Sequence, residues 1–223
     1  MSDVNPLRAQ GVVNYKMLRA AGEGVFVDLK MSKRGEACVI DFYTEMVLEG
    51  RGFQARAGVL TTPVSGDVEI TTANAEMAVD ALNGLAILIV YYNLAIALGT
   101  ATLYEYGLMT AETASSGGDL FTPLLLLGDT NGALSNAQCR VDEAGSTIVT
   151  ADAITTTRML WHGANPVSRA VAGAEESQYV YQPRTPHIIA NDASCWATVG
   201  ADTTAPEYFA TLEWIEMPWV NIS

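Results

Sequence analysis

The sequence contains few of the groups that carry out chemistry in proteins. It has two histidines, His162 and His187, and three widely separated cysteines, Cys38, Cys139 and Cys195, with no CxxC pair. The patterns HExxH, HxxEH, GxSxG and GxGxxG and the P-loop pattern are all absent. An odd number of separate cysteines, without a visible signal peptide, predicts free thiols in a reducing compartment. We therefore expect no cofactor and no metal.

Charged side chains are also scarce, and they are unevenly distributed. Only 17% of the residues are charged, and the net charge is −13. Residues 1–56 hold eight basic and seven acidic residues, a balance of +1, and the other 167 hold 4 and 18, a balance of −14. An acidic body repels phosphates, so nucleic acid is not expected as a partner. The low charge fraction favours a protein that covers part of its surface in an oligomer.

The longest apolar run extends from Leu85 to Met109, and no charge interrupts its first twenty residues. Its length would allow a membrane helix, but it contains Asn93 and has no flanking Lys or Arg, so no membrane contact is expected. A buried helix is a second alternative. The many β-branched and aromatic residues and the break at Gly99 favour a third, two buried strands over residues 85–98 and 101–109.

Alternation with a period of two predicts strands elsewhere. Residues 38–48 alternate most clearly, and residues 208–217 place Tyr208, Ala210, Leu212 and Trp214 on one face. We therefore expect both Phe42 and Trp214 to be buried. Residues 76–82 are predicted as either a strand or a helical turn. The other predicted strands are 25–31, 54–61, 67–72, 121–127, 133–141, 146–150, 154–159, 177–181, 188–190 and 195–199.

About a dozen short strands without a long helix are typical of an all-β protein. The prediction is an antiparallel β-sandwich, jelly-roll-like, with an N-terminal arm over residues 1–22 and a single domain over residues 23–223. Asn131-Gly132 between two predicted strands indicates a hairpin. A calcium loop around Asp129 and Asn131 is disfavoured, because the other ligands of that pattern are missing.

A search for catalytic groups identifies one weak arrangement. Ser194 or Cys195 could act as a nucleophile with His187 as base and Asp192 as orienting acid, but their spacing does not bring them within hydrogen-bond reach. The acid pairs 142–143 and 175–176 leave glycoside hydrolysis open as an alternative. The sequence therefore predicts no catalytic, cofactor-binding or metal-binding residue, and a protein that is not an enzyme.

Aromatic residues raise the question of sugar binding. Tyr91, Tyr92, Tyr104 and Tyr106 could line a glycan-binding face, although such residues more often pack in a core or an interface. Packing is the favoured interpretation. A glycan-binding module would more readily use an exposed ring such as that of Trp161 or Trp219.

Three segments support a resemblance to known proteins. They are residues 91–104, with a Gly-Thr-Ala turn between two strands, residues 121–136, with a polar turn, and residues 207–218, which end the last strand with an aromatic-x-Glu sequence. Together they resemble virion proteins of tailed bacteriophages of the jelly-roll type, over residues 85–218.

The resemblance implies a structural protein of the virion, assembled in the host cytoplasm. It would be a capsid decoration or cement protein, or a minor capsid protein, on the phage head. It implies a homo-oligomer, expected to be a trimer, that contacts the major capsid protein or other virion proteins. The alternative is a receptor- or glycan-binding module of a tail tip or fibre.

The N-terminal arm carries Arg8, Lys16 and Arg19 against Asp3, so it is slightly basic beside an acidic body. It lacks an alternating pattern and contributes little to a sandwich core. We expect it to dock on the capsid or on an adjacent protomer, where ordering offsets its entropy cost. A frayed terminus is the alternative.

Overall fold

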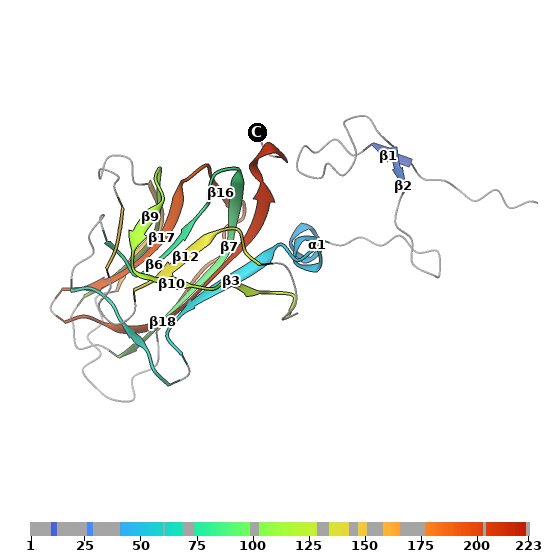
Figure 1. Ribbon diagram of the computed structural model, residues 1–223. Helices are drawn as coiled ribbons and strands as arrows, with labels where there is room; N and C mark the ends of the chain where they lie inside the picture. Colours follow the sequence, from blue (N-terminus) through green and yellow to red (C-terminus); the bar gives the residue numbers. More distant parts are fainter. Residues whose placement is uncertain are drawn as a thin grey trace, which may run out of the picture.

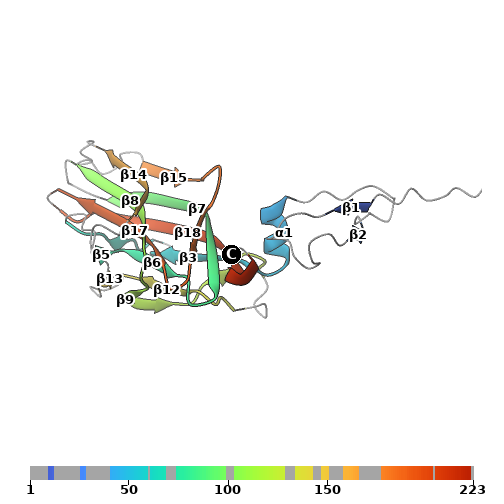
Figure 2. The same ribbon diagram turned by 90° about the horizontal axis from the view of Figure 1, so that it is seen from above.

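The computed structural model describes residues 10–12, 26–28, 41–59, 61–68, 74–98, 103–128, 134–142, 147–150, 158–165, 177–202 and 204–221. Two antiparallel sheets face each other as a sandwich (Figures 1 and 2). The first has the order β10 (Asp119–Phe121), β12 (Gln138–Val141), β6 (Met77–Asp80), β17 (Ser194–Ala201), β8 (Tyr104–Ala111), β14 (Arg158–Asn165). The second has the order β11 (Leu124–Leu125), β3 (Gly52–Ala57), β18 (Glu207–Pro218), β7 (Leu85–Leu98), β15 (Ser177–Tyr181), with β16 (His187–Ala190) also on β7 and β4 (Val64–Ser65) on β18. The predicted antiparallel β-sandwich is confirmed.

The main strands pair in a nested way. From the two ends of the sandwich sequence inward, β3 pairs with β18, β6 with β17, β7 with β15 and β16, and β8 with β14. Successive pairs alternate between the two sheets. The strands from β9 (Ser115–Gly117) to β13 (Ile148–Thr150) lie in the sequence between β8 and β14 and add to the sheet edges or form a small separate sheet.

The core lies between the two sheets and is centred on β7 and β18. Tyr208, Ala210, Leu212 and Trp214 all point into it, so the predicted phase of the last strand is confirmed. Strand β7 spans residues 85–98 as expected, but it contains a β-bulge. Trp214 pairs with Ile89 and Glu213 with Tyr91, which leaves one extra residue on β7. The bulge shifts the alternation, so inward positions change from 85, 87 and 89 to 92, 94 and 96.

Both outer faces of the sandwich are partly covered. Helix α1 (Phe42–Leu48) packs Met46 against Leu88, Ile215 and Met217 on the outside of the seven-stranded sheet. On the six-stranded sheet, Ile148 of a small sheet packs against Trp196. That small sheet is formed by β5 (Asn74–Ala75), β13 (Ile148–Thr150) and β9 (Ser115–Gly117). Residues of β18 near its end are therefore buried on both faces.

The predicted strand over residues 38–48 is wrong, because residues 42–48 form α1. Asp41 caps the helix and accepts hydrogen bonds from the Thr44 amide at 3.0 Å and from the Thr44 hydroxyl. The apolar residues Phe42 and Met46 are four apart, a spacing that fits one helix face as well as one strand face. Phe42 is only half-buried, so its predicted place in the core is also wrong. Cys38 lies outside the described residues.

Several other predictions are also resolved. Residues 77–80 form strand β6, and the second strand of the apolar run begins at Tyr104. The hairpin predicted at Asn131-Gly132 is wrong, since the flanking strands β11 and β12 belong to different sheets; the turn itself lies outside the described residues. Of the predicted strand over residues 67–72, Asp67 forms an isolated bridge to Gly200, and residues 69–72 lie outside the described residues.

Only two short strands of the N-terminal region are described, β1 (Gln10–Val12) and β2 (Phe26–Asp28). They pair with each other and with no described strand of the sandwich, and they lie apart from it in both ribbon views (Figures 1 and 2). β2 falls within the predicted strand 25–31. The rest of the predicted arm lies outside the described residues.

Candidate functional site

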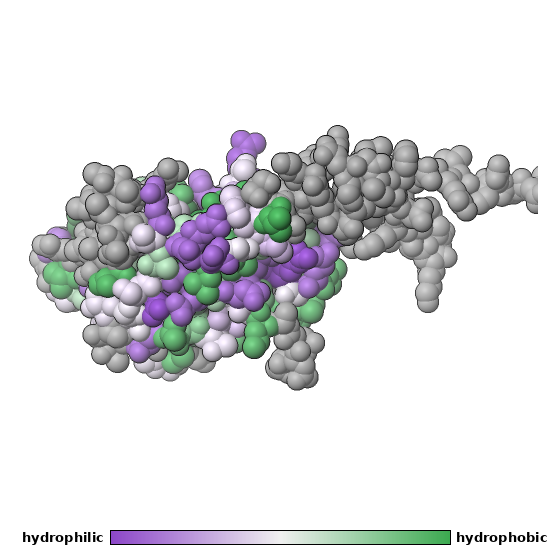
Figure 3. Space-filling model, turned by 45° about the horizontal axis from the view of Figure 1, so that its top comes forward, coloured by the Kyte–Doolittle hydropathy of each residue, from purple (hydrophilic) through white to green (hydrophobic). Residues whose placement is uncertain are grey.

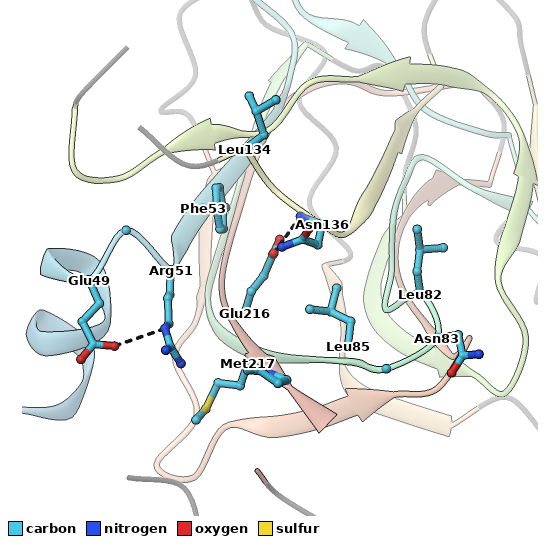
Figure 4. Close-up of a pocket in the computed structure, with 13 residues that line it drawn as sticks. Glu49, Arg51, Phe53, Leu82, Asn83, Leu85, Leu134, Asn136, Glu216 and Met217 are labelled. Atoms are coloured by element: carbon cyan, nitrogen blue, oxygen red, sulfur yellow. Dashed lines mark hydrogen bonds and ion pairs between the residues drawn. The ribbon is translucent and has the colours of Figure 1, made fainter. Parts of the chain in front are cut away.

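A pocket of about 650 Å³ opens at one end of the sandwich (Figure 4). Its walls come from the C-terminal end of α1, the start of β3, the turn between β6 and β7, the end of β18 and the loop that precedes β12. We call it the end pocket. Its apolar lining is provided by Phe53, Leu82, Leu85, Leu134 and Met217. Its size and apolar lining are typical of sites that bind a small molecule or a few side chains.

The carboxylate of Glu216 lies at the inner end of the pocket and is only 4% exposed. One carboxylate oxygen accepts hydrogen bonds from the Ser135 hydroxyl, from the indole Nε1 of Trp214 at 3.1 Å and from the amide of Ala137 at 3.3 Å. The other accepts from the amide of Asn136 at 2.8 Å, a bond drawn in Figure 4. These donors come from β18 itself and from the loop before β12, so Glu216 ties the two together.

The carboxylate of Glu216 has no basic partner among the described residues. Its second oxygen accepts a single described bond, which leaves acceptor capacity toward the pocket. At the rim, the Arg51 side chain pairs with Glu49 at 3.2 Å. Both side chains are more than a third exposed, so this pair contributes little stability. The geometry favours an occupant with an apolar body and a positive charge.

A second buried glutamate lies just before β6, at the end of that strand away from the pocket. Glu76 is 2% exposed, and burial raises its pKa to about 9, with further increases from the charges of Asp67 and Asp142. Burial and the charges of Asp67 and Asp119 likewise raise the pKa of Asp142 to about 6. Within the described ranges, no group of three or more His, Cys, Asp or Glu residues is arranged to hold a metal ion. Because its pKa is about 9, Glu76 keeps its proton at neutral pH, whereas Asp142, with a pKa of about 6, is mostly ionised there.

An aromatic cluster occupies the edge where β14 and β15 end the two sheets. The centroid of the Tyr106 ring lies 4.2 Å from that of Tyr179 and 4.9 Å from that of Trp161. The ring centroids of Tyr92 and Tyr181 each lie 5.9 Å from that of Trp161. Tyr92 and Tyr106 are buried, as is Tyr104, so the core interpretation of these three tyrosines is confirmed. Trp161 is half-buried against the same core.

The structure does not bring together the nucleophile, base and acid that the sequence analysis considered as a catalytic arrangement. Ser194 and Cys195 are buried on β17, whereas His187 is exposed on β16 in the other sheet, and Asp192 is exposed. The Ser194 hydroxyl donates to the carbonyl of Thr113 at 2.7 Å and accepts from the indole of Trp196 at 2.7 Å. Burial raises the pKa of the Cys195 thiol to about 12, which disfavours the reactive thiolate.

The structure also places the remaining residues that the sequence analysis considered. His162 is exposed on β14, and Trp219 is half-buried in the short 3-10 helix after β18. Asp129, Asn131 and the pair 175–176 lie outside the described residues. Sequence reasoning missed both Glu76 and Glu216. Their signal was a charged residue inside an apolar run, as in Trp-Ile-Glu-Met.

Comparisons of the chain with protein-family models, with curated proteins and with solved structures found no match. Among the described residues, no helix is long and apolar enough to cross a membrane.

Proposed function

We propose that this chain is a non-enzymatic structural protein of a tailed-bacteriophage virion. It would act as a capsid decoration or cement protein, or as a minor capsid protein, and would assemble as a homo-oligomer, expected to be a trimer, on the phage head. The proposal extends the resemblance of residues 91–104, 121–136 and 207–218 to proteins of that kind.

The nested strand pairing is the observation that carries the proposal. A chain folded as one long hairpin and then rolled pairs its first strand with its last and its fourth with its fifth. Strands β3, β6, β7 and β8 pair in this way with β18, β17, β15 with β16, and β14. This pattern supports a jelly roll, an architecture that many capsid proteins share.

The surface and the buried polar groups are consistent with a structural role. On the face drawn in Figure 3, hydrophobic and hydrophilic residues are interspersed over the sandwich. Exposed apolar side chains of the described part include Leu48, Leu120, Leu134 and Val220. The hydroxyl of Ser194 and the carboxylate of Asp80 are buried and hydrogen-bonded within the sandwich.

The experiment is a measurement of assembly. Sedimentation of the full chain should reveal a discrete oligomer, and purified particles should contain the chain in fixed stoichiometry. Deletion of residues 2–20 should leave a folded β-sandwich that no longer attaches, and high salt should reproduce part of that loss. A stable monomer that is absent from any particle would contradict the proposal.

The aromatic cluster favours one second candidate, a glycan-binding module of a tail tip or fibre. Trp161 and Tyr179 are only half-buried at the sheet edge and could stack on a sugar ring. A glycan array with the full chain, repeated with Trp161→Ala, tests this idea. Binding to no glycan, together with a high copy number per particle, would remove it.

A further inference from the structure

We propose that the end pocket of one protomer binds the N-terminal segment, residues 1–40, of a second copy of this chain. This inference rests on the homo-oligomer of the proposed function. It adds a site and an occupant to that oligomer.

Charge is the first argument. Residues 1–40 hold six basic and four acidic residues, a balance of +2, whereas residues 41–223 hold 6 basic and 21 acidic residues, a balance of −15. The end pocket has the same sign as the body, with Glu216 at its inner end and no basic partner for that carboxylate among the described residues. A positively charged segment is therefore attracted to this end of the sandwich.

Composition is the second argument. Residues 12–19 read Val-Val-Asn-Tyr-Lys-Met-Leu-Arg, which places Lys16 and Arg19 among five apolar side chains. The pocket offers apolar walls formed by Phe53 and Leu85 and an acidic group with spare acceptor capacity. An apolar side chain next to a cation satisfies both features of the pocket at once.

Exposed leucines at the rim are the third argument. Leu134 is 80% exposed and Leu82 is 39% exposed, and both line the pocket mouth (Figure 4). Docking of a segment over them would remove apolar surface from water. The same rim is formed by the end of α1, the first described element after the N-terminal strands, so each chain carries the segment and its receptor close together in sequence.

The occupant is taken from a second copy because β1 and β2 of the same chain pair with each other and lie apart from the sandwich (Figures 1 and 2). Exchange of the segment between copies fills every pocket in a closed oligomer and leaves none empty.

The test uses the full chain with a photoreactive amino acid at position 134. A matched control carries the same group at position 120, because Leu120 is 67% exposed on β10 and does not line the pocket. Irradiation of position 134 should give a band of twice the chain mass on a denaturing gel, with the attachment mapped by mass spectrometry to residues 12–19. Position 120 should give no such link. Links only to residues outside 1–40, or only within one chain, would overturn the inference.

Sedimentation of Leu134→Glu and Leu120→Glu separates this inference from the proposed function. We expect Leu134→Glu to raise the concentration needed for association at least tenfold, and Leu120→Glu to leave it unchanged. The double variant Lys16→Glu/Arg19→Glu should reproduce the effect of Leu134→Glu. If the unmodified chain is a monomer throughout, the homo-oligomer itself fails. If it associates and Leu134→Glu has no effect, the homo-oligomer stands and the pocket has another role.

Discussion

Two glutamates, Glu76 just before β6 and Glu216 on β18 at the end pocket, are buried to almost the same extent, and their surroundings differ. Glu216 accepts hydrogen bonds from one hydroxyl, one indole and two backbone amides. Glu76 lies near the acids Asp67 and Asp142 instead, and burial, followed by the charges of these two acids, raises its pKa to about 9. The comparison teaches that burial alone does not decide what a carboxyl group contributes. Converging donors make it a structural tie, whereas burial beside other acids makes it a site that keeps its proton.

The largest loss of stability is expected from Trp214→Ala, which removes one of the donors to Glu216 and leaves the surroundings of Glu76 unchanged. The indole is fully buried, lies 6.4 Å from the Phe53 ring and donates to Glu216. Its loss should cost about 3–5 kcal/mol of unfolding free energy, because a cavity opens and one donor disappears. Chemical denaturation measures the change. Trp161→Ala is the matched control, and an equal loss there would show that the Glu216 contact adds nothing.

Glu216→Gln should destabilise the protein by about 2–4 kcal/mol, since an amide NH₂ would then face groups that are themselves donors. The half-exposed neighbour Glu213 on β18 provides the control, and Glu213→Gln should change stability much less. Urea unfolding at neutral pH measures both variants. A neutral result for Glu216→Gln would mean that the three hydrogen bonds from the loop before β12 do not hold that loop to β18.

Glu76→Gln should have the opposite effect and increase the stability of the folded protein. In the folded protein Glu76 keeps its proton up to about pH 9, while in the unfolded chain it ionises near its ordinary value of 4.5. The folded state therefore binds more protons between these two values, and stability falls as pH rises through that range. Removal of the group should stabilise the protein at pH 8 by on the order of 2–3 kcal/mol, after allowance for burying an amide.

Thermal unfolding from pH 5 to pH 10 checks this sign. The unmodified protein should lose stability with rising pH, and Glu76→Gln should flatten the curve. Glu216→Gln, measured in parallel, should lower stability at every pH. A destabilising Glu76→Gln at pH 8 would show that the proton on Glu76 takes part in a hydrogen bond that the protein needs.

The sequence predicted the sandwich because most of its strands follow a period of two and are rich in β-branched and aromatic residues. It predicted the phase of β18 as far as Trp214. It failed at α1, where Phe42 and Met46 satisfy both periods and the Asp41 cap decides the outcome. It failed at the Asn131-Gly132 hairpin, because β11 pairs with β3 instead of β12.

The end pocket could not be predicted for a different reason. Its residues come from four separate stretches of chain that only the nested pairing brings together. A charged residue in an apolar stretch, such as Glu216, marks a buried polar group, but alternation cannot say whether donors or acids surround it.

The smallest loss of stability is expected from Ser135→Ala. This change removes one donor to Glu216 and leaves the carboxyl group itself in place. The Ser135 hydroxyl donates to Glu216 and also accepts from the Ala137 amide at 3.2 Å, and both contacts are partly buried. Removing them should cost about 1 kcal/mol, less than Glu216→Gln, because the other three donors remain.

Ser116→Ala is the matched control, since that exposed hydroxyl makes only a 3.5 Å contact with the Val149 carbonyl. Combining Ser135→Ala with Glu216→Gln should cost less than the sum of the two, because the two groups share one hydrogen bond. Strictly additive losses in urea unfolding would mean that Ser135 stabilises the loop independently of Glu216.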